Sequence, residues 1–349
     1  MKMIDRFLAK RFAGNLLLVL CVVCGIIFAT AFMQEIAASP LTQAVNSSFS
    51  HFLEMFPMFL PLVAFMGTLL TFYKLLLSSE LVIIQSSGLS TYEIMRPMLL
   101  TSVIFGAITA TVINPLATKY NRTELMGQRI EKIDNAIWLR EKTDAGSIVI
   151  RATGMKNSPE DGLVFSNATL IKQNEKYQIT ERASADILIL ENGVISAKNA
   201  LILDSKGIQS RRDFDMSTSL SRKNIIRQYL KSNQVSFWAL PEFIKTLKSM
   251  GAPATMHTLQ FLSLLFLPFV LVSMTVLGVL FSRTKQRRNF SFTKQFGLGI
   301  VVCFVVYFII QIFNAMGSSG AMAPVLAAFF PPVIVLFFAA TAITRSDNI

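Results

Sequence analysis

The chain has 349 residues, of which 52% are hydrophobic and only 15% are charged, and its formal net charge is +12. Because a soluble domain carries about a quarter of charged residues, this composition indicates a membrane protein and excludes an ordinary soluble one. The positive charge does not indicate nucleic-acid binding, since no basic stretch carries interleaved aromatic residues or a recognised binding motif.

Six apolar segments approach or exceed the roughly 20 residues that a helix needs to cross a bilayer. The expected spans are Phe12–Met33, Phe52–Leu77, Ile94–Ala117, Leu259–Phe281, Phe296–Met316 and Ala323–Ile343. The first is too long for the apolar core of a signal peptide, so we expect it to remain as a membrane helix. Pro57 and Pro61 in the second span and Pro115 in the third are expected to kink their helices.

Basic residues in the short loops predict the orientation of the spans. Lys and Arg gather before the first span, between the fourth and fifth, and after the sixth, whereas residues 34–51 contain neither. We therefore expect a multi-pass membrane protein with both termini in the cytoplasm. The segment after the third span then lies on the opposite side of the membrane.

That inserted segment, residues 118–253, is expected to form an all-β domain, either a sandwich or a jellyroll-like roll. Short β-type runs occur at Ser147–Arg151, Leu163–Phe165, Tyr177–Thr180, Ala185–Leu190 and Ala200–Leu203. Turn residues separate them at Asp161-Gly162, Asn192-Gly193 and Lys206-Gly207.

Helical patterns flank the β-type runs. A polar helix is expected from Tyr120 to Asn135, and an amphipathic helix at Phe237–Ser249, capped by Ser236 and closed by Gly251, leads back to the membrane. The predicted organisation is three spans in residues 1–117, the β-rich domain in 118–253, and three spans in 254–349.

No combination of residues predicts an enzyme. His51 and His257 have no partner at ligand spacing, and Cys21 and Cys24 lie within one apolar span. Nucleophile motifs, metalloprotease motifs and phosphate-binding loops are missing from the sequence. We expect no catalytic residue, no metal site and no cofactor on this chain, so any ATP must be hydrolysed by another subunit.

The connection between spans two and three, about residues 78–90, is the strongest candidate site. Ser78 or Ser79 can cap a short helix that begins at Glu80, where the helix dipole favours an anion. Such a helix either docks into a cytoplasmic ATPase or only links two spans at the interface, and the residues alone leave both readings open. The expected docking residues are Glu80, Leu81, Ile84, Gln85 and Gly88.

Ser79–Ser90 resembles the Glu-Leu-x₆-Gly-x-Ser/Thr signature of the YjgP/YjgQ permeases, the lipopolysaccharide-export pair LptF and LptG. Ile4–Phe7 is similar to the Leu-Asp-Arg-Tyr opening of that family, and Ala136–Arg140 to the first strand of its periplasmic domain. Further similar segments follow in the family's order: Phe243–Gly251, Tyr307–Phe313 and Ala327–Pro331. The Trp-Leu-Arg strand and the Tyr307–Phe313 run favour LptG over its sister LptF.

This resemblance implies an ABC-transporter permease that extracts lipopolysaccharide and passes it to a periplasmic β-jellyroll bridge. The implied partners are an LptF-like chain, two copies of an LptB-like ATPase that uses ATP, and an LptC-like component. Glu80 matches the glutamate that contacts the ATPase. The alternatives are the LptF-like sister subunit and a membrane scaffold that recruits periplasmic partners without moving lipid.

The sequence departs from the LptG pattern in one respect. LptG proteins often carry lysines near the periplasmic end of span one, whereas this chain has no Lys or Arg between Arg11 and Lys74. Either the lipid headgroup carries fewer phosphates or the partner chain supplies the positive charge. The two amides in span five either line the lipid path or bond to a neighbouring helix. The candidate lipid-contacting residues are Phe28, Gln34, Glu35, Gln311 and Asn314.

Overall fold

The computed structural model describes residues 3–36, 40–127, 137–143, 146–158, 162–174, 178–191, 193–204, 209–218, 234–249, 253–282 and 292–347. The chain forms two compact units. A helical unit contains residues 1–121, 236–241 and 255–349, and a β unit contains residues 122–235 and 242–254.

The helical unit confirms the six predicted spans. Within the described residues, six helices are long and apolar enough to cross a membrane: Met3–Glu35, Leu41–Leu77, Thr91–Asn121, Thr255–Ser282, Gly297–Ser318 and Pro324–Arg345. They belong to α1 (Met3–Glu35), α2 (Leu41–Leu77), α4 (Thr91–Ile108) with the π-helical η1 (Thr109–Ile113) and α5 (Asn114–Gly127), α8 (Thr255–Ser282), α9 (Phe292–Ser318) and α10 (Pro324–Asp347). A short helix, α3 (Glu80–Ser86), lies between α2 and α4.

The second helix starts well before the predicted residue, at Leu41 rather than at Phe52. Its first three turns are mostly polar, so a search for apolar runs does not detect them. Ala44 and Ser48 are nevertheless fully buried, four residues apart on one face. Packing of this face extends the helix beyond its apolar part.

Helix α8 lies at the centre of the bundle and contacts α2, α4, α9 and α10. Small residues let it approach α4 closely: a Cβ atom added at Gly106 would lie 2.6 Å from the Cα atom of Pro268. Ser102 and Thr275 share a hydrogen bond of 2.8 Å across the same contact. Close backbone approach and interhelical hydrogen bonds are the forces that hold helices together in lipid.

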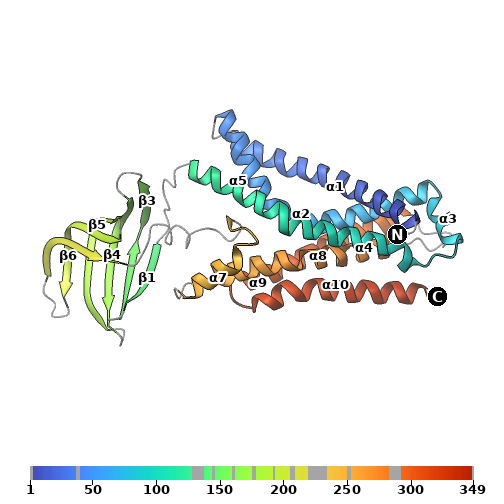
Figure 1. Cartoon of the computed structure of the whole chain (residues 1–349). Helices are drawn as coiled ribbons and strands as arrows, with labels where there is room; N and C mark the ends of the chain where they lie inside the picture. Colours follow the sequence, from blue (N-terminus) through green and yellow to red (C-terminus); the bar gives the residue numbers. More distant parts are fainter. Residues whose placement is uncertain are drawn as a thin grey trace. The chain divides into compact units, whose positions relative to one another are not determined.

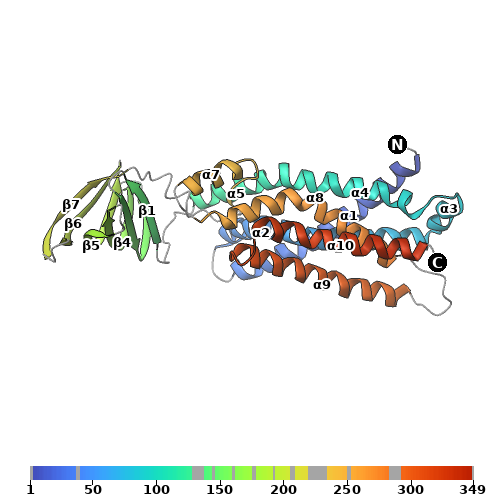
Figure 2. The same cartoon turned by 90° about the horizontal axis from the view of Figure 1, so that it is seen from below.

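The two ends of the bundle carry different connections. The start of α1, helix α3 and the end of α10 lie at one end, and the α1–α2 and α9–α10 connections lie at the other (Figures 1 and 2). This alternation agrees with the one that the Lys and Arg distribution predicts.

The β unit confirms the predicted all-β insert. Its strands are β1 (Ile137–Thr143), β2 (Gly146–Ala152), β3 (Gly154–Ser158), β4 (Gly162–Gln173), β5 (Ile179–Glu191), β6 (Val194–Asp204) and β7 (Gln209–Ser217). They form one antiparallel sheet in the order β1-β2-β4-β5-β6-β7, with β3 paired to β4. Among the described residues this single sheet agrees with the predicted roll rather than with a sandwich of two sheets. Tyr177 and the predicted turn residues Asp161, Asn192, Lys206 and Gly207 lie outside the described residues.

The sheet is bent along a line that crosses its central strands. In β4, Leu163 and Phe165 are buried before this line, and Ala168 and Leu170 are buried after it. The inward-facing residues are therefore the odd-numbered ones before the bend and the even-numbered ones after it. Asn167, between the two pairs, has φ 47°, and Asn199 in β6 has φ 56°. Side chains from both halves belong to one apolar cluster, and the strands curve accordingly (Figure 1). The bend therefore lets a single sheet enclose its own core.

The helix that follows the sheet, α7 (Leu240–Ser249), begins later than predicted. Ser236 contributes its backbone carbonyl, which accepts 3.0 Å hydrogen bonds from the backbone N–H groups of Ala239 and Leu240. Pro241 lies in the first helical turn, where its missing N–H has no cost. Gly251 lies outside the described residues, as do residues 128–135 of the predicted polar helix.

Candidate functional site

The site begins with α3, whose start differs from the prediction. Ser79 adopts a left-handed conformation (φ 58°, ψ 6°) and makes no side-chain capping bond. The Ser78 hydroxyl instead donates to the carbonyl of Lys74 in α2, at 3.0 Å. The predicted serine cap is therefore wrong, because a capping residue needs an extended backbone to present its oxygen to the helix.

Glu80 is held by a residue of its own chain. Nη2 of Arg11 in α1 donates to both carboxylate oxygens of Glu80, at 3.2 and 3.3 Å. The Arg11 guanidinium also lies over the Phe7 ring, 5.8 Å from its centroid. In the sequence Arg11 counts only as one of the charges that orient span one. The structure shows that it connects α1 to α3.

A second polar contact lies one turn further along α1. The side-chain amide of Asn15 donates to the Thr71 hydroxyl at 3.1 Å, and Lys74 donates to the Asn15 oxygen at 2.7 Å. Asn15 is almost fully buried. Lys74 therefore lies at the end of the bundle that carries α3, whereas Glu35 lies at the other end, where α1 ends.

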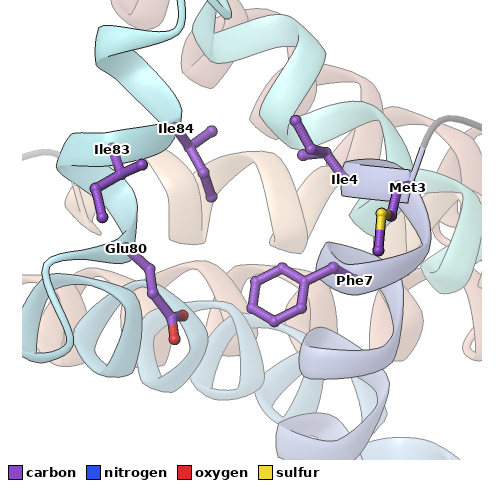
Figure 3. Close-up of a pocket in the computed structure, with 6 residues that line it drawn as sticks. All are labelled: Met3, Ile4, Phe7, Glu80, Ile83 and Ile84. Carbon is purple, nitrogen blue, oxygen red and sulfur yellow. The ribbon is translucent and has the colours of Figure 1, made fainter.

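A groove of about 300 Å³ lies between the start of α1 and α3. Its lining combines one carboxylate with apolar side chains (Figure 3): Met3, Ile4, Phe7, Glu80, Ile83 and Ile84. Two segments with family resemblance, Ile4–Phe7 and Ser79–Ser90, thus meet at one surface.

The remaining predicted docking residues fall on different faces of α3. Leu81 is buried in the core of the bundle and Ile84 packs against that core, whereas Gln85 is exposed. Val82 and Ile83, which sequence reasoning did not select, are 58% and 67% exposed. The outward surface of α3 is therefore more apolar than predicted.

The end of α3 and the start of α4 explain the Gly-x-Ser part of the signature. Gly88 has φ +84°, a left-handed conformation that glycine adopts without strain, and its N–H bonds to Gln85 as α3 ends. Ser90 then starts α4: its hydroxyl accepts from the backbone of Glu93, and its own backbone N–H donates to the Glu93 carboxylate at 2.8 Å. This capping box was readable from Ser-x-x-Glu.

The candidate lipid-contacting residues of α1 lie near its far end. Phe28 stacks on Phe32, with ring centroids 6.2 Å apart, and Gln34 is exposed. Oε1 of Glu35 lies 3.5 Å from Nε2 of His51 in α2. The two side chains form an ion pair when the imidazole is protonated.

The two amides of α9 are half-buried. Gln311 lies one turn after Tyr307 in the same helix. The Tyr307 ring in turn stacks on Phe59 of α2, with centroids 6.3 Å apart. Asn314 lies nearly one turn beyond Gln311. In the described part of the chain, no cluster of three or more His, Cys, Asp or Glu side chains is arranged to hold a metal ion.

Comparison with known proteins identifies the family. The family described as "Lipopolysaccharide export system permease LptF/LptG" matches residues 6–345, from the first turns of α1 to the end of α10. The chain belongs to the LptF/LptG permease family. It is similar to the "Lipopolysaccharide export system permease protein LptG" of Escherichia coli (strain K12), with 22% identity over 285 residues that cover 78% of this chain and 77% of that protein. LptG of Escherichia coli O6:H1 (strain CFT073) matches with the same identity and coverage.

The LptG-like resemblance is thus confirmed, and with it a multi-pass permease of the lipopolysaccharide-export family. The matched range contains both sides of the groove apart from Met3 and Ile4. The groove between α1 and α3 is therefore the candidate site of an LptF/LptG permease.

Proposed function

We propose that this chain is an LptG-like subunit of an ABC transporter in the bacterial inner membrane, with an LptF-like chain, two LptB-like ATPase copies and an LptC-like component as partners. It extracts lipopolysaccharide and passes it to a periplasmic β-jellyroll bridge. Both termini and α3 lie in the cytoplasm, and the β unit lies in the periplasm. ATP is bound and hydrolysed by the ATPase, and this chain carries no cofactor.

The observation that carries the proposal is the surface of α3. Val82 and Ile83 expose their apolar side chains, and Ile83 lines the same groove as Glu80, at the end of the bundle where both termini lie (Figure 1). Exposed apolar residues next to a charge are typical of a surface that another protein covers. The Glu80 side chain stays 32% exposed beside Arg11. Since a carboxylate accepts about four hydrogen bonds, Glu80 can also accept from a cation of the ATPase.

The contacts of α3 support a route from the ATPase to the spans. Leu81 is buried in the bundle core, Arg11 connects Glu80 to α1, and the capping box fixes the following helix. Displacement of α3 by the ATPase would therefore act on α1, α2 and α4 together. Only 11% of the apolar segment of α1 and 17% of that of α9 are buried within this chain, which fits contact with lipid and with the sister chain.

The β unit supports transfer to the bridge. Strands β1 and β7 end the sheet order, and an edge strand offers backbone groups to which a similar domain can add a strand. The side chains of the apolar inner face are buried against one another, so acyl chains would enter only if the two halves of the bent sheet move apart, while the sugars stay in water.

Two experiments test the proposal. Ser87→Cys, in a background in which Cys21, Cys24 and Cys303 are replaced by Ala, should react with a membrane-impermeant thiol reagent only from the cytoplasmic side. Labelling only from the periplasmic side would refute the proposed docking, because the ATPase lies in the cytoplasm.

The second experiment measures the docking itself. Glu80→Ala and Ile83→Ser should each reduce the amount of ATPase that copurifies and the export of lipopolysaccharide. Leu77→Ser is the control, because Leu77 is 68% exposed at the end of α2 and lies outside α3. Unchanged copurification and export in both α3 variants would contradict the transporter assignment and favour a scaffold.

A further inference from the structure

The third span is interrupted at the end that leads into the β unit. η1 has π-helical hydrogen bonding, in which the N–H of Asn114 reaches back to the carbonyl of Thr109. Pro115 follows directly and has no N–H, so the carbonyl of Thr111, four residues earlier, lacks its α-helical partner. π-Helical turns occur frequently at functional sites.

A distant segment supplies the missing partner. Nε1 of Trp238 donates to the Thr111 carbonyl at 3.1 Å. The backbone N–H of the preceding residue, Phe237, donates to Oδ1 of Asn114 at 2.9 Å. Asn114 is only 6% exposed, so this hydrogen bond is shielded from water.

The same segment packs on the centre of the bundle. The Phe237 ring stacks on Phe261 of α8, with centroids 5.5 Å apart and planes 19° from parallel. The Trp238 ring meets the Phe237 ring edge-on, with centroids 5.3 Å apart, and 67% of Trp238 is exposed on this chain. Its N–H group is the polar contact that joins it to the third span.

These contacts lie close in sequence to the residues at which the chain passes from one unit to the other. Asn114 begins α5, through which the chain leaves the helical unit after Asn121. After Val235 the chain first returns to the helical unit at Ser236–Pro241, passes through residues 242–254 of the β unit, and enters α8 at Thr255. The outgoing connection and this first return are thus joined to each other and to the third span at one place, which we call the η1 clamp (Thr111, Asn114, Phe237 and Trp238).

We infer that Asn114 and Trp238 are positioning residues for lipid transfer, which deliver movement of the third span to the outgoing connection of the β unit and to the first return of the chain at Ser236–Pro241. Converting η1 to α-helical bonding would shift its register by one residue and turn the helix beyond it by roughly 100°. Such a turn would move Asn114 and redirect the Thr111 carbonyl, and both bonds of the clamp would break together. This inference rests on the proposed function, because the movement it describes is that of a transport cycle.

Three single variants separate the clamp from general folding. Trp238→Phe keeps an aromatic ring and removes the N–H donor. Asn114→Leu keeps the approximate shape and removes the acceptor, whereas Asn114→Asp keeps an acceptor oxygen and serves as the matched rescue.

The full chain is reconstituted in proteoliposomes with its sister permease and the ATPase, with lipopolysaccharide as the probe. Three quantities are measured: amide hydrogen exchange of residues 236–241, the rate of ATP hydrolysis, and lipopolysaccharide transferred per ATP. Because a single hydrogen bond is lost, we expect exchange to rise about two- to tenfold in Trp238→Phe and Asn114→Leu. Transfer per ATP should fall by a similar factor while ATP hydrolysis stays within about twofold, and Asn114→Asp should resemble the wild type.

The outcomes are separable. Faster exchange with unchanged transfer per ATP would overturn the positioning role, and so would unchanged exchange. Equal loss of ATP hydrolysis and transfer would mean that the clamp only supports folding, which also refutes the inference. A wild-type complex without ATP-driven transfer would instead refute the proposed function.

Discussion

The ion pair between Arg11 and Glu80 gives the most direct prediction about the site. Arg11→Met removes the guanidinium and keeps an unbranched apolar side chain of intermediate length. Glu80 then loses both hydrogen bonds that connect α3 to α1. We expect α3 to detach locally more often while the bundle stays folded, because the buried contacts of Leu81 remain.

The size of the effect follows from the exposure of the pair. Two unit charges about 4 Å apart interact by about 4 kcal/mol at an effective dielectric constant near 20. The side chains of Arg11 and Glu80 are 40% and 32% exposed, so solvent screening reduces the net contribution to about 0.5–1 kcal/mol. Opening of α3 should therefore become about two- to fivefold more frequent.

Hydrogen exchange measures this opening. The backbone N–H groups of Ile83 and Ser87, bonded to the carbonyls of Ser79 and Ile83, should exchange about two- to fivefold faster in Arg11→Met. The first turn of α4 is the internal control, because its cap does not involve Arg11. Arg11→Lys should recover part of the protection, since it retains the charge. If Arg11→Met and Glu80→Gln both leave the exchange of α3 unchanged, the pair does not anchor this helix.

Three further predictions test other features. Gly88→Ala should destabilise the end of α3 by about 1–2 kcal/mol, because residue 88 has a positive φ. Gly88→Asn should destabilise it by less, and amide hydrogen exchange of α3 measures both effects. Equal effects of the two variants would refute the explanation by backbone conformation. Gly106→Ala should lower the free energy of unfolding of the purified protein by about 1–3 kcal/mol, because the added Cβ would meet the Pro268 backbone. Gly25→Ala, with no neighbour within 4 Å, is the control and should not lower it. Glu35→Lys should raise the share of fully phosphorylated lipid A that copurifies, as measured by mass spectrometry. If fully phosphorylated lipid A already dominates in the wild type, the positive charge that binds its phosphates comes from the partner chain.

The spans were predictable because a bilayer demands about 20 apolar residues in each helix. The same signal failed where helices continue outside the apolar core. The first turns of α2, from Leu41 to His51, are polar and are recognised only from the packing of Ala44 and Ser48.

The site was predictable where its determinants are local and not where they are distant. The position of Glu80 in the first turn of α3 and the termination at Gly88 follow from neighbouring residues. The partner of Glu80 does not, because 69 residues separate it from Arg11. Trp238 was missed for the same reason: its N–H group serves a carbonyl 127 residues away.

Two strands of the β unit carried weak sequence signals. β7 (Gln209–Ser217) contains two arginines and two aspartates and buries only Phe214. Such charged strands are usual at the edge of a sheet, where one side remains without a neighbour. β5 (Ile179–Glu191) was predicted as two separate runs, because the mostly polar residues 181–184 (Glu-Arg-Ala-Ser) interrupt its apolar pattern.

The left-handed asparagines make the β unit sensitive to small changes in sequence. A β-branched residue at Asn167 or Asn199 would favour an extended backbone. The strand would then straighten, and one half of its inward-facing row would turn to the outside. Two exposed side chains thus determine whether this single layer folds back on its own apolar core or forms a flat sheet.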